Sequence, residues 1–383
     1  MRIGITCYPT YGGSGVVATE LGMELAARGH EVHFISYAMP FRLAELGGPP
    51  EAAHRIHYHE VEVVTYPLFD YPPYALALAT KMAEVAEHYE LDLLHVHYAI
   101  PHSVSAYLAQ QMLAPRRLPV VTTLHGTDIT LVGQDRSFLP ITRFAIEQSD
   151  GVTAVSNYLR DVTRREFNVT RPIEVITNFV NCDRYQRTVD GARRKEFAPQ
   201  GEFLIAHLSN FRPVKRLPDV IEVFARVRRE LPARLLLIGD GPERANAEYL
   251  VREKDISDDV LFLGKQSNVA DTLGLCDLFL LPSDLESFGL AALEAMACEV
   301  AVIAADVGGL RELIQPGQDG CLVPARDVAG MARCALELLR QPERAREMGQ
   351  RARQTARARF CSTLVIPRYE AFYENLLNGR PQA

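Results

Sequence analysis

"MRIGITCYPTYGGSGVVATELGMELAARGHEVHFIS", residues 1–36, decides the class of fold. An apolar run leads into a glycine-rich turn, then into an apolar pattern of helical period that ends at Gly29, and then into a second apolar run. This order of strand, loop, helix and strand predicts a βαβ unit with two parallel strands. We therefore expect a parallel sheet of the α/β class at the start of the chain.

Further strand-like runs continue the same rhythm through the first half of the chain. They are "LDLLHVHY" at 91–98, "PVVTTLHG" at 119–126, "GVTAVS" at 151–156 and "IEVITN" at 173–178. Helical or loop-like sequence separates them, which is typical of a parallel sheet covered on both faces. Residues 1–180 are therefore expected to form an N-terminal Rossmann-like domain.

The second half repeats this organisation. A polar, basic stretch from about 181 to 200 predicts a linker, and the βα rhythm restarts at "FLIAHLSN" (203–210). Residues 181–383 are thus expected to form a second Rossmann-like domain. Its last helix, at about 362–379, should dock an apolar face, with the N-terminal domain as one candidate surface. Two such domains facing each other imply a substrate cleft at the carboxyl ends of their strands.

The composition is that of a globular protein and excludes several classes. With 48% apolar and 23% charged residues in 383, the chain can bury full cores in two or three domains, which excludes disorder and fibres. A formal charge of −7 argues against a broad nucleic-acid or anionic-membrane surface and favours an anionic metabolite. Without a secretion signal or a long apolar run, a cytoplasmic protein is expected. The seven scattered cysteines are expected to be reduced core thiols.

Two loops carry groups suited to phosphate. Gly13, Ser14 and Gly15 lie between the first strand and its helix, where missing Cβ atoms let a phosphate approach backbone amides. Arg212 and Lys215 follow the first strand of the second domain, where a diphosphate would need two cations. The alternatives are a plain tight turn and a solvated basic turn.

"ESFGLAALE", residues 286–294, places a carboxylate on either side of an expected helix start. Eight helical steps would put Glu286 and Glu294 roughly 12 Å apart, too far to share a proton but suited to holding two ends of one elongated ligand. The amides of Phe288, Gly289 and Leu290 open the helix between them. For Glu294, a solvated helix position is the alternative.

Histidines provide further candidates. His125, in "HGTD", ends a strand at the expected cleft and is either catalytic or structural. Two groups invite comparison with a metal site: His54, His57 and His59, and His95, His97 and His102. His95 and His97 alternate onto one strand face with no carboxylate or cysteine nearby at a spacing that completes a site, and the first group lies in an expected surface strand pair, so no metal is expected. Dehydrogenase, hydrolase and kinase motifs are also lacking.

In order, "GGSG", "HGTD", "SNFRPVKR", "GDGP", "ESFGLAALE" and "VGGLREL" resemble the motifs of retaining glycosyltransferases of the GT-B fold, of the family 4 type. The resemblance spans essentially the whole chain. Longer stretches such as "CYPTYGGSGVVATELG" and "TTLHGTDITLVG" are similar to the branch that transfers N-acetylglucosamine from UDP-N-acetylglucosamine to the hydroxyl of L-malate, the first step of bacillithiol biosynthesis. The resemblance implies retention of the α configuration and no metal cofactor.

The resemblance also implies roles for single residues. Donor-binding roles fall on Gly13, Ser14, Gly15, Arg212, Lys215, Leu263, Gly264, Glu286, Phe288, Gly289, Leu290 and Glu294. Among these, Glu294 would hold the ribose, Glu286 would face the hexose, and backbone near Leu263 and Gly264 would read the uracil. Roles in the chemical step fall on His125, Glu286, Arg212 and Lys215. Acceptor binding falls on Tyr98, Thr127 and Arg143, the last of which is suited to a carboxylate.

Other functions remain open at this stage. A glycosyltransferase of the same fold could use another small acceptor or a lipid-linked one, although the sequence has no basic amphipathic helix typical of membrane binding. A UDP-N-acetylglucosamine 2-epimerase shares the two-domain architecture, and a non-catalytic nucleotide-sugar sensor would need the same donor residues. Stable membrane association and nucleic-acid binding are not expected, and homo-oligomer formation is left open.

Overall fold

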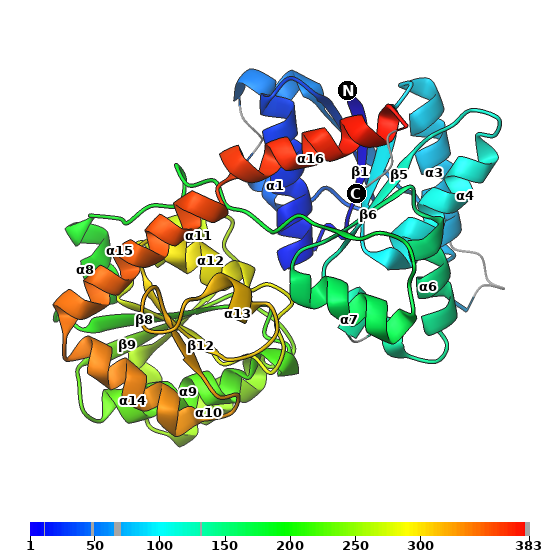
Figure 1. The fold of residues 1–383 in the computed structure, drawn as a ribbon. Coiled ribbons are helices and arrows are strands. Elements are labelled where there is room, and N and C mark those ends of the chain that lie inside the picture. The colour runs from blue at the N-terminus through cyan, green and yellow to red at the C-terminus, as the bar shows by residue number, and fades with distance from the viewer. Residues whose placement is uncertain (11, 47–49, 65–69, 131, 380–383) are drawn as a thin grey trace. The chain divides into compact units, whose positions relative to one another are not determined.

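The computed structural model describes residues 1–10, 12–46, 50–64, 70–130 and 132–379. The chain divides into two compact units (Figure 1). Unit 1 contains residues 1–177 and takes up the chain again at Val365, whereas unit 2 contains residues 178–364. Each unit is built on a parallel sheet, so the predicted α/β class with two Rossmann-like domains is confirmed.

Unit 1 has a seven-stranded sheet in the order β3-β2-β1-β4-β5-β6-β7. Its strands are β1 (Arg2–Thr6), β2 (Glu31–Ser36), β3 (Ile56–Glu60), β4 (Leu93–His97), β5 (Val120–Leu124), β6 (Gly151–Ala154) and β7 (Glu174–Val175). Its helices are α1 (Gly13–Ala27), α2 (Phe41–Leu46), α3 (Tyr74–His88), α4 (Val104–Met112), α5 (Thr127–Thr130), α6 (Leu139–Gln148), α7 (Asn157–Phe167) and most of α16 (Ser362–Leu377). The strand order reverses between β1 and β4.

Unit 2 has a six-stranded sheet in the order β10-β9-β8-β11-β12-β13. Its strands are β8 (Phe203–Leu208), β9 (Ala233–Ile238), β10 (Val260–Gly264), β11 (Leu278–Leu281), β12 (Ala301–Ala305) and β13 (Cys321–Val323). Its helices are α8 (Gly191–Phe197), α9 (Leu217–Arg228), α10 (Arg244–Glu253), α11 (Val269–Leu273), α12 (Leu290–Ala297), α13 (Leu310–Leu313), α14 (Val328–Leu339) and α15 (Pro342–Arg359). Here the order reverses between β8 and β11.

The apolar runs of the sequence form the central strands. Leu278, Phe279 and Leu280 of β11 are fully buried, as are Ile3 and Ile5 of β1. A parallel strand with helices on both faces has no solvent side, so its sequence is continuously apolar rather than alternating. This burial fixes the strands, and therefore the loops at their carboxyl ends.

Helix α16 returns from the end of the chain to pack on unit 1. Tyr369 and Tyr373 are buried on this helix, and the Tyr373 hydroxyl lies 2.7 Å from Nδ1 of the buried His95 on β4. Glu370 forms an ion pair with Arg28 at 2.8 Å and a hydrogen bond with His30 at 2.9 Å. The last helix therefore contributes to the core and to the surface of unit 1.

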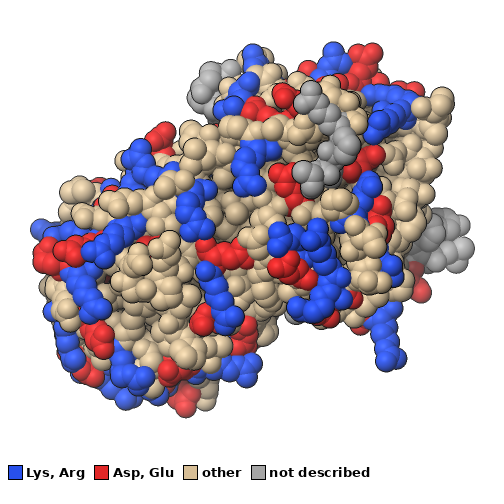
Figure 2. Space-filling model, viewed as in Figure 1, with Lys and Arg blue, Asp and Glu red and all other residues tan. Residues whose placement is uncertain are grey.

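The charged surface is mixed in sign. On the face drawn in Figure 2, Lys and Arg side chains are interspersed with Asp and Glu. Over the residues that the structure describes, no helix is both long enough and apolar enough to cross a bilayer.

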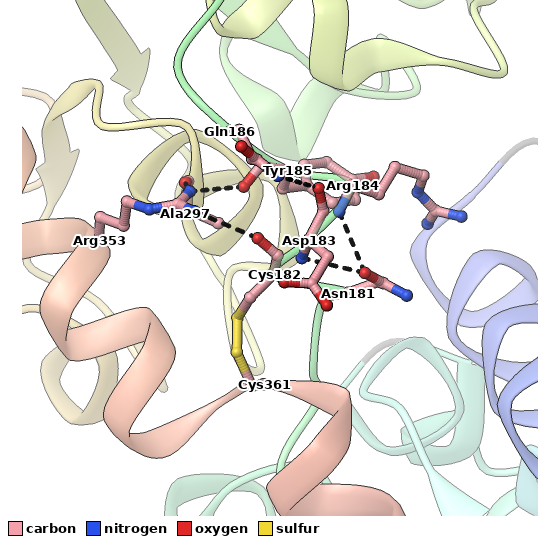
Figure 3. Close-up of a disulfide and its surroundings, with 9 residues drawn as sticks. All are labelled: Asn181, Cys182, Asp183, Arg184, Tyr185, Gln186, Ala297, Arg353 and Cys361. Carbon is pink, nitrogen blue, oxygen red and sulfur yellow. Dashed lines mark hydrogen bonds between the residues drawn. A yellow bond between two sulfur atoms is a disulfide. The ribbon is translucent and has the colours of Figure 1, made fainter. Parts of the chain in front are cut away.

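A disulfide joins Cys182 to Cys361, two residues separated by 179 positions (Figure 3). The expectation of seven reduced thiols is wrong for this pair, because the fold brings together two segments that sequence spacing cannot relate. Backbone bonds hold the same junction, since the Val180 amide donates to Phe360 and the Ser362 amide donates to Val180, at 3.0 and 2.9 Å. Cys7, Cys276 and Cys298 are free and buried, and Cys321 and Cys334 are free and half-buried.

Candidate active site

The predicted site residues follow the strands at which each sheet reverses its order. In unit 1 the glycine loop follows β1 and Tyr98 follows β4; in unit 2 Arg212 and Lys215 follow β8 and Glu286 follows β11. Loops from two such strands run to opposite faces of the sheet and leave a crevice, which is where open α/β sheets bind ligands. Each unit therefore carries its own set of candidate site residues at such a crevice.

The glycine loop presents backbone amides at the start of α1. Gly12 caps the helix, and the amides of Gly13, Ser14 and Gly15 precede the first intrahelical bond, which runs from Val16 to Gly12. A Cβ atom at Gly15 would lie 2.5 Å from the carbonyl oxygen of Tyr8, so a larger residue would displace the loop. The helix start can therefore receive an anion at close range.

Tyr98 is held in an uncommon backbone conformation beside this loop. Its φ is 92°, a value that costs a non-glycine residue roughly 1–3 kcal/mol. Its amide donates to Thr123 at 3.0 Å, and its hydroxyl accepts a bond from the Ser14 hydroxyl at 3.1 Å. The aromatic rings of Tyr8 and Tyr98 pack edge to face at 5.3 Å. The structure thus brings the predicted residues Ser14 and Tyr98 together.

His125 belongs to a hydrogen-bonded pair of histidines. Its Nε2 lies 2.7 Å from Nδ1 of His97, and its ring centroid lies 5.6 Å from that of Tyr98. Burial lowers the pKa of His125 to about 3 and places the pKa of His97 well below its usual value, so both rings are neutral near pH 7. In a pair of neutral imidazoles, one nitrogen of the hydrogen bond carries the proton and the other accepts it. The tautomer of His97 therefore determines whether the other nitrogen of His125 is a donor or an acceptor.

Asp128 fixes the backbone around His125. Its carboxylate accepts from the amides of Gly126 and His125 at 2.9 and 3.3 Å, and from the amide of Ala99 at 3.1 Å. Burial raises the pKa of Asp128 to about 6, although the backbone hydrogen bonds act in the opposite direction. The carboxylate therefore ties the loop after β5 to the turn that follows Tyr98.

The two other predicted acceptor residues are less constrained. Thr127 starts α5 directly after the His125 loop and is half-buried. Arg143 lies on α6 with an exposed side chain, and in the part of the chain that the structure describes its guanidinium has no hydrogen-bond or ion-pair partner. Among the described residues, no hydrogen bond or ion pair links Arg143 to the Tyr98 and His125 pair.

In unit 2, Lys215 and Glu286 form an ion pair. Lys215 Nζ lies 2.6 Å from Glu286 Oε1, which also accepts from the Ser283 hydroxyl at 2.8 Å. The loops that carry them are joined by the Asp284 amide, which donates to the Val214 carbonyl at 2.9 Å. Arg212 lies three residues before Lys215 with an exposed side chain. The loops after β8 and β11 are thus in contact. Lys215 is paired with Glu286, whereas the Arg212 side chain is exposed.

The helix start within "ESFGLAALE" is formed as predicted. Gly289 precedes α12 with a φ of 96°, which favours glycine, and a Cβ atom there would lie 2.5 Å from the end of the Leu310 side chain, which would have to shift. Phe288 and Glu294 are buried, with 3% and 4% exposure. The Tyr185 hydroxyl donates to Glu294 Oε1 at 2.6 Å. The alternative of a solvated Glu294 is therefore wrong.

Leu263 and Gly264 end β10, which is the edge strand beyond β9. The Leu263 carbonyl accepts from the Gln266 side chain at 2.7 Å, and the Gly264 carbonyl accepts from the Gly239 amide at 2.8 Å. Gly264 has a φ of 66°, which turns the chain out of the sheet. Their position at a strand end suits contact with a base, and each carbonyl keeps one lone pair for it.

Sequence reasoning missed several residues that support the site. His97 was treated only as part of a histidine group, and Asp128 only as part of "HGTD", although each holds His125. Ser283 and Tyr185 hold the two glutamates. Tyr185 lies in the expected linker, where no local pattern pointed to it, because its role depends on a helix more than a hundred residues later.

Known proteins resemble this chain over its full length. Residues 11–184 match the family described as Glycosyltransferase Family 4, and residues 189–355 match Glycosyl transferases group 1. N-acetyl-alpha-D-glucosaminyl L-malate synthase of Bacillus anthracis is 49% identical over 378 residues, which are 98% of this chain and 97% of the relative. D-inositol 3-phosphate glycosyltransferase of Nocardia farcinica is 29% identical over 374 residues, 89% and 80% of the two chains.

Solved structures share the fold. Anabaena HepE, in complex with UDP and glucose, matches with a TM-score of 0.81 at 19% identity, covering 98% of this chain and 99% of that chain. At this identity the likeness supports the fold alone, and it confirms the predicted GT-B class. With two family matches that together span most of its residues and a relative at 49% identity, the chain belongs to the same glycosyltransferase family as the N-acetyl-alpha-D-glucosaminyl L-malate synthase of Bacillus anthracis.

Proposed function

We propose that this glycosyltransferase transfers N-acetylglucosamine from UDP-N-acetylglucosamine to the hydroxyl of L-malate, with retention of the α configuration, as the first step of bacillithiol biosynthesis. The observation that carries this proposal is the 49% identity, over 98% of the chain, to the N-acetyl-alpha-D-glucosaminyl L-malate synthase of Bacillus anthracis. The relative at 29% identity acts on an inositol phosphate according to its name, so family membership alone leaves the acceptor open.

Unit 2 provides the proposed donor residues. Arg212 and Lys215 bind the diphosphate, and the amides at the start of α12 contact the sugar and phosphate. Glu294, oriented by Tyr185, accepts hydrogen bonds from the ribose hydroxyls. Lys215 contacts Glu286 at 2.6 Å in the structure, so an arriving phosphate competes with a carboxylate for the same ammonium group. Glu286 then becomes available to the hexose.

Unit 1 provides the proposed acceptor residues. Tyr98, Thr127 and Arg143 bind malate, with the Arg143 guanidinium on a carboxylate. The amides of the glycine loop approach the donor phosphate and the acceptor. His125 lies beside Tyr98 and is neutral near pH 7, so it can hydrogen-bond to a sugar hydroxyl without adding a charge. Asp128 and His97 act as positioning residues for His125.

The proposed chemistry is front-face substitution at the anomeric carbon. The malate hydroxyl oxygen attacks from the side on which UDP leaves, the bond from carbon to the diphosphate oxygen breaks, and a phosphate oxygen takes the hydroxyl proton. Arg212 and Lys215 stabilise the negative charge that grows on the leaving UDP, a contribution of preorganised cations that requires no protein nucleophile. In this proposal, the two positive side chains offset the negative charge of the leaving diphosphate, and no metal ion takes part.

Product analysis tests the proposal. The protein is incubated with UDP-N-acetylglucosamine, with and without L-malate, and the products are identified by mass. We expect release of UDP only with malate, together with a glycoside of malate. Free N-acetylmannosamine would instead indicate an epimerase, and transfer to an inositol phosphate but not to malate would indicate the acceptor of the more distant relatives. Absence of turnover with every acceptor would favour a sensor and contradict the proposal.

A further inference from the structure

Three side chains with metal-binding atoms meet at the edge of the unit 1 sheet. Strands β2 and β3 are parallel, and their register places His33 directly opposite His57. Glu31 lies two residues before His33 on β2, so its side chain points to the same face. Since β3 is the edge strand, this face is open on one side. Glu31, which is distant from His57 in the sequence, is therefore brought beside it by strand pairing.

The distances suit a tetrahedral ion. Glu31 Oε1 lies 3.3 Å from Nε2 of His33 and 3.4 Å from Nε2 of His57. The ligating atoms of all three side chains lie within 4.8 Å of one another. Around a tetrahedral Zn²⁺, nitrogen and oxygen ligands at about 2.0–2.2 Å are separated by about 3.4 Å. A direct hydrogen bond would instead draw nitrogen and oxygen to about 2.9 Å.

His33 supplies a buried nitrogen that faces the Glu31 carboxylate. The residue is fully buried, and among the residues that the structure describes its Nε2 has no hydrogen-bond partner. The other ring nitrogen, Nδ1, shares a hydrogen bond with His59 Nε2 at 3.0 Å. If Nδ1 donates to His59, then Nε2 directs a lone pair toward the Glu31 carboxylate, an arrangement that a cation between them would stabilise. Metal-bound histidines usually donate their second ring nitrogen in this way.

The surroundings of the three side chains provide one wall and leave an entrance. The ring of Tyr89 packs on His33 with centroids 4.6 Å apart and forms one wall. Glu31 and His57 have side-chain exposures of 39% and 36%, so an ion can enter from solvent.

We infer that Glu31, His33 and His57 form a binding site for Zn²⁺ or a similar divalent transition ion, with a fourth position open to water. Two imidazoles and one carboxylate favour such an ion over Mg²⁺ or Ca²⁺, which prefer oxygen ligands. The site lies in β2 and β3 themselves, whereas the proposed transferase residues of unit 1 follow the carboxyl ends of β1, β4 and β5. It is therefore distinct from the transfer reaction and does not depend on the proposed function.

Metal titration tests this site. The full chain without a histidine tag is titrated with Zn²⁺ against a chromogenic chelator, and with Co²⁺ to record the visible absorption of a tetrahedral complex. We expect one equivalent to bind to the wild type, and we expect His57→Ala to weaken binding at least tenfold and to remove the tetrahedral spectrum. His57 is chosen because it is partly exposed, whereas replacement of the buried His33 could prevent folding.

His54→Ala is the matched control, because His54 lies on the same segment with an exposed side chain outside the three ligands. It should bind like the wild type. Unchanged melting temperatures of the metal-free variants would show that the fold is intact. Wild-type binding no tighter than that of His57→Ala, or an equal loss in His54→Ala, would overturn the assignment.

Discussion

Tyr185 shows how a single residue can control a ligand contact that it does not make. Its hydroxyl donates to Glu294 Oε1 at 2.6 Å, and Glu294 is buried on α12. A hydrogen-bond donor orients such a buried carboxyl group, and leaving the group without a partner costs about 1–3 kcal/mol. We therefore expect the binding of the donor ribose by Glu294 to depend on the Tyr185 hydroxyl.

We predict that Tyr185→Phe raises the KM for UDP-N-acetylglucosamine roughly tenfold or more, because about 1.4 kcal/mol corresponds to a factor of ten. The KM for malate and kcat should change much less, since the change affects donor binding. Initial-rate kinetics with each substrate varied in turn would measure this split. Tyr249→Phe, at a position with 59% exposure on α10, is the control and should be neutral. A matching rise in both KM values would contradict a role limited to the donor.

At the scale of elements, α16 is the part of unit 1 whose contribution is easiest to isolate. Its buried face carries Tyr369, Phe372 and Tyr373, and the Tyr373 hydroxyl is hydrogen-bonded to the buried His95. The other ring nitrogen of His95 lies 2.6 Å from the Thr123 hydroxyl, so both nitrogens of this buried ring are satisfied. Removing the phenol would leave one of them unpaired.

Tyr373→Phe should therefore lower the free energy of unfolding by about 1–3 kcal/mol, the usual cost of a buried polar group that loses its partner. Chemical denaturation followed by circular dichroism would measure it. Leu377→Ala, on the same helix but 37% exposed, should stay within about 0.5 kcal/mol of the wild type. If the two substitutions had equal effects, the bond to His95 would not be what anchors the helix.

For the whole molecule, buried histidines make stability depend on pH. Burial lowers the pKa of His95 and His125 to about 3 and that of His102 to about 4, and the pKa of His97 lies well below its usual value. In the unfolded chain each titrates near about 6.5. Between that value and about 4 the unfolded state binds protons that the folded state does not, so unfolding is favoured as the pH falls.

The folded state should thus be fully stabilised above about pH 6.5 and should lose about 1.4 kcal/mol per pH unit for each of these histidines below it. Asp128 acts in the opposite direction, because burial raises its pKa to about 6, but it is outnumbered by these four histidines together with His207, whose pKa burial lowers to about 4. Urea unfolding at pH 7.5 and 5.5 would measure the change, and His102→Gln should make it shallower. A midpoint at pH 5.5 equal to or above that at pH 7.5 would refute this account.

The parts of the molecule that were predictable are those with local causes. The strands follow from continuous apolar runs, and the glycine loop and Gly289 follow from backbone requirements within a few residues. The loops after β8 and β11 could be assigned to one ligand because each ends a strand. What could not be predicted depends on distant partners: Tyr185 with Glu294, Cys182 with Cys361, and Glu31 with His57. These pairs form because of the strand order and the helix packing, which cannot be predicted from a short stretch of sequence.

The division of the chain also has a consequence for biosynthesis. Unit 2 is continuous from residue 178 to 364, whereas unit 1 needs α16, which is translated after all of unit 2. Domains generally fold as they emerge from the ribosome. Unit 2 can therefore fold on the nascent chain as soon as it emerges from the ribosome. In unit 1, His95 on β4 lacks its hydrogen-bond partner Tyr373 until α16 has been translated. The half of the molecule synthesised first is thus the half that is completed last.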